Sequence, residues 1–144
     1  MVSEYVISSD LHAIDRDVVF RFLHEDAYWS AGLPRDVFDR SLESSLCFSA
    51  FAGKHGPQVG FARVVSDRAT FAWLCDVFVL PEHRGKGVAR RLMEAVMAHR
   101  DLMRVRNFLL ATRDAHDLYA RYGFAPLAEP ARWMAIRRQY PRSG

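Results

Sequence analysis

A basic stretch punctuated by glycines offers the clearest chemistry in the sequence. Residues 83–93 read HRGKGVARRLM and follow the apolar run DVFVLPE. Gly85 and Gly87 allow the backbone to approach an anion closely, and the start of a following helix adds a positive partial charge. Arg84 and Lys86 add formal charge. We therefore predict a pyrophosphate-binding loop here, with a purely structural glycine turn as the alternative.

The spacing of this loop differs from that of two common nucleotide-binding loops. The pattern G-x-x-x-x-G-K-[ST] requires Ser or Thr after Gly-Lys, whereas Lys86 is followed by Gly87. The pattern G-x-G-x-x-G fails because position 90 is arginine. The loop also follows three consecutive strand-like segments instead of a parallel βαβ unit. The loop therefore belongs to neither of these two classes, and pyrophosphate binding stays the prediction.

Asp76 is the first candidate for proton transfer. It lies in the apolar run WLCDVFVL, where a carboxylate is costly unless it is paired or functional. We expect either a general base or a buried pair with an arginine, with His116 and His24 as weaker alternatives for the base. The two cysteines, Cys47 and Cys75, lie in strand-like runs and are interpreted as reduced core thiols. The six histidines show no metal-ligand spacing, so no metal is predicted.

Periodicity predicts the elements that position these residues. Strand patterns and helical patterns alternate along the chain in the order β, α, α, β, β, β, α, β, α, β, an α+β arrangement. Segment 108–112 is almost wholly apolar and is expected to be a strand buried on both faces. Thr112 can cap the next helix, which should stop at Gly123. The expected strands are 4–8, 46–53, 58–67, 69–80, 108–112 and the tail RWMAIRR, and the expected helices are 15–29, 34–44, one from Val88 to about 98, and 114–122.

Composition is that of an ordinary globular protein, and residues 1–144 are expected to form one domain. No apolar run approaches the roughly 20 residues of a membrane span. The N-terminus lacks the pattern of a signal peptide, which favours a cytoplasmic location.

The net charge is +3, and its distribution is uneven. Seven acidic residues lie in the first two predicted helices; if these helices border a binding site, they favour a cationic ligand. The arginines near the C-terminus are interpreted as solvated. The acidic residues are Asp15, Asp17, Glu25, Asp26, Asp36, Asp39 and Glu43.

Two motifs resemble the GNAT superfamily of acyl-CoA-dependent N-acetyltransferases. Residues 84–89, RGKGVA, match its R/Q-x-x-G-x-G/A signature and follow the usual Val-x-Pro-Glu at 79–82. Residues 118–124, LYARYGF, are similar to its Y-x-x-x-G-F segment. The motifs occur in the expected order, and the resemblance covers nearly the whole chain. Residues 28–32, together with 45–48, also resemble a bacterial subgroup whose substrates are generally unassigned.

The resemblance implies a GNAT fold, a mixed, mostly antiparallel sheet of about six to seven strands splayed in a V and flanked by about four helices. Acetyl-CoA would lie between the strand ending at Leu80 and strand 108–112. Backbone groups would bind its pantetheine arm and pyrophosphate, and an N–H near Val79 would stabilise the carbonyl oxygen. The implied cofactor-binding residues are Phe78, Val79, Arg84, Gly85, Lys86, Gly87, Val88, Ala89 and Arg90.

The resemblance also assigns Tyr119 as the acid that protonates the departing thiolate, with packing on the sheet as the alternative. A phenol suits this role because its ordinary pKa, about 10, lies above that of a thiol, about 8.5. Tyr28 and Trp29 are expected to line the acceptor pocket, unless they are core aromatics.

The expected function is acetyl transfer from acetyl-CoA to a primary amine of a small molecule or peptide. A CoA-binding sensor without turnover is the alternative. A nucleic-acid-binding domain is disfavoured because no recognised motif accompanies the arginines. No membrane partner is expected, and a homodimer is left open.

Overall fold

The computed structural model describes residues 4–140. Its strands are β1 (Tyr5–Ser8), β2 (Ser45–Ala52), β3 (Gln58–Ser66), β4 (Phe71–Val79) and β5 (Asn107–Leu110). Its α-helices are α1 (Arg16–Arg21), α2 (Arg35–Glu43), α3 (Val88–Ala98) and α4 (His116–Ala120). Shorter helical turns are η1 (Leu11–Ala13), η2 (Phe22–Asp26), η3 (Pro81–His83) and η4 (Pro130–Arg132).

The strands form one mixed sheet in the order β1-β2-β3-β4-β5. The first four strands pair antiparallel, and β5 is parallel to β4. This α+β architecture confirms the predicted fold, but the described residues hold five strands where about six to seven were expected. The prediction of a strand in the tail RWMAIRR was wrong, because Arg132 belongs to η4 and residues 133–138, all of them described, form no strand.

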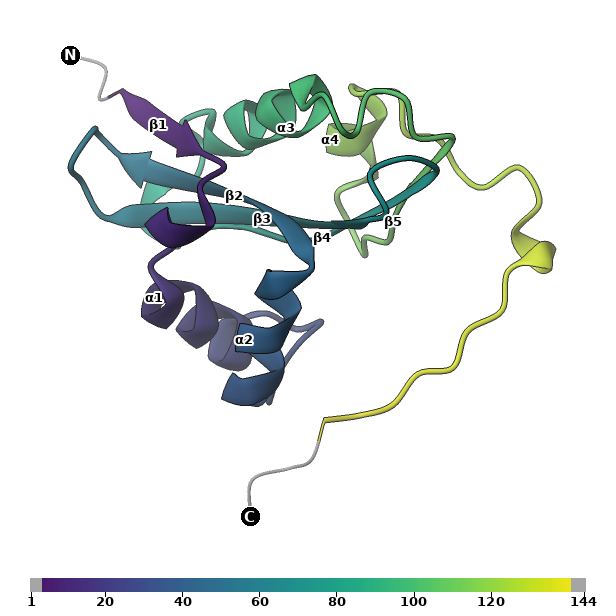
Figure 1. Cartoon of the computed structure of the whole chain (residues 1–144), viewed down its shortest axis with the longest axis horizontal. Helices are drawn as coiled ribbons and strands as arrows, with labels where there is room; N and C mark the ends of the chain where they lie inside the picture. Colours follow the sequence, from purple (N-terminus) through teal and green to yellow (C-terminus); the bar gives the residue numbers. More distant parts are fainter. Residues whose placement is uncertain (1–3, 141–144) are drawn as a thin grey trace.

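Helices cover both faces of the sheet (Figure 1). On one face, α3 and α4 pack through a cluster that includes Val88, Leu92 and Tyr119. On the other, α1, η2 and α2 pack through a second cluster that includes Val19 and Phe38. The apolar periodicity of these helices is therefore explained by burial against the sheet. No helix of residues 4–140 is long and apolar enough to cross a membrane.

The first predicted helix is divided in two. The expected continuous helix over 15–29 is instead α1 followed by a π-helical turn, η2, in which the amide of Ala27 donates to the carbonyl of Phe22 at 2.9 Å. The hydroxyl of Ser30 donates to the carbonyl of Leu23 at 2.7 Å. Such turns are rare and occur frequently at functional sites. Here the turn brings the chain out of the helix directly before Tyr28 and Trp29.

Strand β4 extends beyond its parallel partner. The pairing of β4 with β5 ends at Leu74↔Leu110, whereas β4 continues to Val79. The edge of β4 that faces away from β3 is therefore unpaired from about residue 75 onward. Because β5 is at the sheet edge, its residues are partly buried or exposed, which corrects the expectation of a strand buried on both faces.

Candidate active site

A cavity of about 490 Å³ lies at the carboxyl ends of β4 and β5, where the two strands stop pairing. Its walls come from β4, from the segment after β5, from α4, from the turn after η2 and from the C-terminal segment. Four residues predicted from the sequence as catalytic or substrate-binding line this one cavity: Tyr28, Trp29, Asp76 and Tyr119.

Asp76 sits at a β-bulge in β4. Phe61 opposes Phe78 and Arg63 opposes Cys75, so two residues of β4, Asp76 and Val77, oppose the single residue between them in β3. Asp76 has a φ of 53°, a left-handed conformation that costs of order 1–3 kcal/mol in a residue other than glycine. Such bulges re-aim side chains, and this one accompanies the exposure of the Asp76 carboxylate to the cavity.

Both carboxylate oxygens of Asp76 accept hydrogen bonds from neighbouring side chains. Oδ2 accepts from Nε of Arg63 at 2.8 Å, and Oδ1 accepts from Nε1 of Trp29 at 2.9 Å. The side chains of Arg63 and Asp76 are only 15% and 12% exposed, so this is a largely buried ion pair. The arginine partner considered from the sequence is thus Arg63, and the carboxylate also fixes Trp29 at the cavity wall.

Tyr119 is buried in α4, and its side chain reaches the cavity. Burial, and secondarily the nearby Tyr28, raise the pKa of its hydroxyl above the ordinary tyrosine value. The phenol therefore stays protonated at neutral pH. Thr112 accepts a hydrogen bond from the amide of Ala115 at 3.1 Å and so holds the turn that leads into α4. Helix α4 ends at Ala120, two residues before the predicted end at 122, and Gly123 follows the helix with a φ of +96°.

Tyr28 closes one side of the cavity by contacting the segment after β5. Its hydroxyl accepts from the amide of Arg113 at 3.2 Å, and the Arg113 guanidinium lies 3.9 Å from the ring centroid. The Tyr28 and Trp29 rings meet edge to face with centroids 5.1 Å apart. Both aromatics therefore line the cavity; Tyr28 is exposed, whereas Trp29 also packs against the core cluster beneath α1 and α2.

The glycine loop lies between β4 and α3. Gly85 and Gly87 have φ values of +75° and +81°, which side-chain-bearing residues rarely adopt. Gly87 caps α3 without a side-chain hydrogen bond, and its first turn holds no acidic residue. The amides of this first turn are therefore available to an anion. Arg84, Lys86 and Arg90 are exposed around them, whereas Val88 is buried in the core.

Val79 presents its backbone to the open edge of β4. The amide of Leu80 donates to the carbonyl of Val59 in β3 at 2.8 Å, and backbone direction alternates along a strand. Val79 consequently faces away from β3, and its carbonyl accepts from Nε of Arg84 at 2.9 Å. Phe78 turns its backbone towards β3, and its ring stacks on Phe22 with centroids 4.1 Å apart. Of the two residues predicted to contact pantetheine, Val79 is the one placed to do so.

The remaining titratable candidates lie elsewhere or are inert. His24 contacts the carbonyl of Leu33 at 2.8 Å, and neither His24 nor His116, both described, is among the cavity-lining residues. Cys75 lines the cavity, but burial raises the pKa of its thiol to about 12, which makes it a poor nucleophile. Burial likewise raises the pKa of Cys47 to about 11. Within residues 4–140, no group of three side chains is arranged to hold a metal ion.

Several wall residues were not identified from the sequence. The C-terminal segment contributes Arg137, Arg138 and Tyr140, and β4 contributes Trp73 and Val77. Trp73 carries a local signal, an aromatic residue in an amphipathic strand, but nothing local places the tail beside β4.

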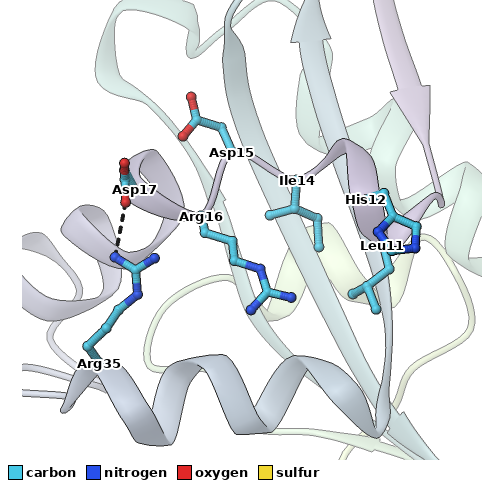
Figure 2. Close-up of a pocket in the computed structure, with 7 residues that line it drawn as sticks. All are labelled: Leu11, His12, Ile14, Asp15, Arg16, Asp17 and Arg35. Carbon is cyan, nitrogen blue, oxygen red and sulfur yellow. Dashed lines mark hydrogen bonds and ion pairs between the residues drawn. The ribbon is translucent and has the colours of Figure 1, made fainter.

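A second hollow lies between the η1–α1 segment and α2 (Figure 2). Its charged residues satisfy one another: Arg35 contacts Asp17 at 3.0 Å and Asp39 at 3.2 Å, and Arg16 contacts Asp39 at 3.0 Å. It contains none of the catalytic or binding residues predicted from the sequence, and we assign no chemistry to it.

Comparison with known proteins identifies the family. Residues 43–126 match the acetyltransferase (GNAT) domain. The chain belongs to the GNAT acetyltransferase family. A Gibberella zeae protein provisionally named as an acetyltransferase is 31% identical over 136 residues, covering 82% of this chain and 77% of that protein.

Solved structures of GNAT proteins have the same fold. A crystal structure from Xanthomonas campestris pv. campestris, provisionally assigned to the GNAT acetyltransferases, is 48% identical, with a TM-score of 0.91 over 96% of each chain. A Staphylococcus aureus structure described as a probable acetyltransferase is 20% identical with a TM-score of 0.72, covering 95% of this chain and all of that one, and is similar in fold. GNAT acetyltransferases use acetyl-CoA as acetyl donor.

Backbone groups of this chain suit the CoA donor of the GNAT family in their chemistry. The two left-handed glycines and the uncapped start of α3 follow β4 in the sequence. The N–H of Val79 at the end of β4 faces the open edge, whereas its carbonyl accepts from Nε of Arg84. These groups offer hydrogen-bond donors and positive charge to a pyrophosphate and a backbone edge to an amide-bearing arm. The chemistry of these groups therefore fits CoA.

Proposed function

We propose that this protein is an N-acetyltransferase that moves an acetyl group from acetyl-CoA to a primary amine of a small molecule or peptide, by direct attack in a ternary complex. One observation carries the proposal. A single cavity at the open edge of β4 brings together a neutral buried phenol, a buried carboxylate and two aromatic walls, and β4 leads through η3 into the glycine loop.

The loop and the edge of β4 would hold the donor. Amides at the start of α3, with Lys86, Arg90 and the free Nη groups of Arg84, would bind the pyrophosphate; Gly85 and Gly87 provide the conformation, and Val88 and Ala89 continue the turn. The carbonyl of Val79 would bind the pantetheine arm in place of Nε of Arg84, which leaves its N–H for the thioester, and Phe78 would support the strand from the core. When bound, acetyl-CoA supplies an acetyl thioester and leaves as a thiol.

Tyr119 would supply the proton that the departing thiolate takes up, because its raised pKa keeps it protonated. Asp76 would take the proton from the attacking amine, directly or through one water. A carboxylate has about four lone-pair sites, so two remain after the bonds from Arg63 and Trp29. The backbone N–H of Val79 faces the same edge and would stabilise the negative charge that develops on the carbonyl oxygen. The new C–N bond replaces the C–S bond, and the proton lost by the amine balances the one gained by sulfur.

The test is to incubate the protein with acetyl-CoA and a panel of primary amines, and to follow both free thiol and acetylated product by mass spectrometry. We expect thiol release that depends on the amine, with product formed in equal amount. Thiol release without acetylated amine would indicate hydrolysis and would contradict the proposal.

A CoA-binding sensor is the second candidate, favoured by one observation: both oxygens of Asp76 already accept hydrogen bonds in the structure. Tight binding of acetyl-CoA without transfer to any amine of the panel would support the sensor. Loss of turnover in Tyr119→Phe would exclude it.

A further inference from the structure

The C-terminal segment contributes to the cavity without contributing to the core. Residues 125–140 are all exposed. After α4 they run away from the sheet and then return towards the side of the molecule that carries α1 and α2 (Figure 1). Arg137, Arg138 and Tyr140 nevertheless line the cavity. A β-carbon at Gly32 would lie 3.9 Å from Cβ of Tyr140, so the segment passes against the turn that carries Tyr28 and Trp29.

The tail gives the cavity a surplus of positive charge. Of the other charged wall residues, Arg63 is paired with Asp76, and Asp114 lies 3.8 Å from Arg113. Arg137 and Arg138 take part in no ion pair within residues 4–140. The interpretation of the tail arginines as merely solvated therefore does not account for these two, which border the cavity in the described structure.

The acidic residues of the first two helices do not compensate this charge. None of Asp15, Asp17, Glu25, Asp26, Asp36, Asp39 and Glu43, all within the described part of the chain, lines the cavity. Asp17 and Asp39 are bound to Arg35 and Arg16 in the second hollow. Only Val37 and Ser41 of α2 reach the cavity. The acidic residues therefore do not line the cavity, as a preference for a cationic acceptor would require.

Arginine side chains suit one class of ligand group. The guanidinium group is planar, stays charged and presents paired N–H donors that match a carboxylate or a phosphate. Positive charge at the wall also disfavours the protonated form of a nearby amine, and so favours the nucleophilic form. The aromatic walls from Trp29, Trp73 and Tyr140 suit a ligand with an apolar or planar body between its amine and its anionic group.

We propose that the acceptor is a primary amine that also carries a carboxylate or a phosphate, and that Arg137 and Arg138 of the C-terminal segment bind this anionic group while the amine points towards Asp76. The inference rests on the proposed N-acetyltransferase function. It makes the tail a specificity-determining segment of the enzyme.

The experiment compares amines that differ only in their anionic group. β-Alanine against β-alaninamide forms the carboxylate pair, and phosphoethanolamine against ethanolamine forms the phosphate pair. Each pair is measured with the wild type, with Arg137→Gln/Arg138→Gln and with Arg132→Gln. Arg132 is the matched control because it lies in the same exposed segment, pairs with Glu129 at 2.7 Å and is outside the cavity wall. The substituted positions are exposed, so folding should be retained.

We expect the wild type and Arg132→Gln to have the lower KM for the anionic member of at least one pair. The double variant should raise that KM by about tenfold or more, which is the loss expected for a charge-assisted hydrogen bond. The kcat and the KM for the neutral amine should change little. The pair of amines whose KM changes in the double variant shows whether the bound group is a carboxylate or a phosphate. A wild-type preference for the neutral members, or an unchanged KM in the double variant, overturns the inference.

Titration calorimetry of the CoA-bound protein with the same amines makes the result independent of turnover. If an anionic amine binds and the double variant weakens that binding, the tail site is supported even when no acetyl group is transferred. In that case only the proposed reaction is overturned. Equal binding of anionic and neutral amines overturns the tail site even if turnover is observed. Absence of acetyl-CoA binding in the wild type overturns the proposed function itself.

Discussion

Tyr119 combines burial with access to the cavity, and this combination is what a proton donor for a thiolate needs. Because its pKa is raised, the hydroxyl stays protonated as the pH rises through neutrality and beyond the ordinary tyrosine value. The loss of activity that follows its ionisation should therefore begin at a more alkaline pH than for an exposed tyrosine.

Tyr119→Phe should lower kcat by about 10²-fold, the lower end of the usual range for general acid–base catalysis. Steady-state kinetics will show this, with the KM for acetyl-CoA within about twofold because the ring and its packing remain. Tyr122→Phe is the control: Tyr122 lies one turn along, its hydroxyl is 3.5 Å from the carbonyl of Arg90, and it is outside the cavity wall. Equal losses in the two variants would indicate a packing role.

Asp76 has two roles that a pair of variants can separate. Asp76→Asn should reduce kcat by about 10²-fold or more if the carboxylate accepts the proton. Trp29→Phe removes one hydrogen-bond donor to Asp76 and keeps the carboxylate and an aromatic wall, so kcat should fall by less than about tenfold. Melting curves of both variants control for the loss of the buried pair with Arg63. Similar kcat losses in both variants would assign Asp76 to positioning Trp29 instead.

At the scale of elements, the glycine loop and the start of α3 form the proposed phosphate site. Gly87→Glu introduces a side chain with a carboxylate at a residue whose φ is +81°. The affinity for acetyl-CoA, measured by titration calorimetry, should fall at least about 100-fold. Gly53→Glu is a matched control in the turn between β2 and β3, with a φ of +95° and open space for the new β-carbon. If Gly53→Glu weakens binding as much, the effect is one of stability or net charge and the loop assignment fails.

The local motifs were predictable from the sequence, and the long-range features were not. The conformations of Gly85 and Gly87 were predictable because they depend on neighbouring residues, and Tyr119 was predicted from its resemblance to the GNAT Y-x-x-x-G-F segment. Asp76 was marked as unusual, but the bulge depends on the register between β3 and β4 and has no local signal.

The π-turn of η2 and the unpaired tail escaped prediction for similar reasons. The helical period over 15–29 continues through η2, so apolar spacing alone does not show the wider turn. RWMAIRR has the composition of a strand, but a strand needs a partner, and the structure gives this segment none among residues 4–140.

At the scale of the whole molecule, the residues that stabilise the fold and the residues that line the cavity lie in different parts of the sheet and its surroundings. The helices on both faces bury the core, whereas the cavity lies where the pairing of β4 with β5 ends, and the glycine loop follows β4. The tail belongs to the cavity but not to the core, because residues 125–140 are exposed throughout. Stability and acceptor binding should therefore respond differently to its removal.

A chain ending at Ala128 should keep its circular dichroism spectrum and its acetyl-CoA affinity, with a melting temperature within about 4 °C of the full chain, since no described buried residue is lost. The same truncation should raise the KM for the acceptor by at least about tenfold, because it removes part of the cavity wall. Trp133, Met134 and Ile136 of the tail are 48%, 96% and 80% exposed, and so would suit an apolar contact with a second copy of the chain. A melting temperature that falls by more than about 10 °C, together with conversion of a dimer to a monomer in sedimentation, would show that the tail is buried between protomers.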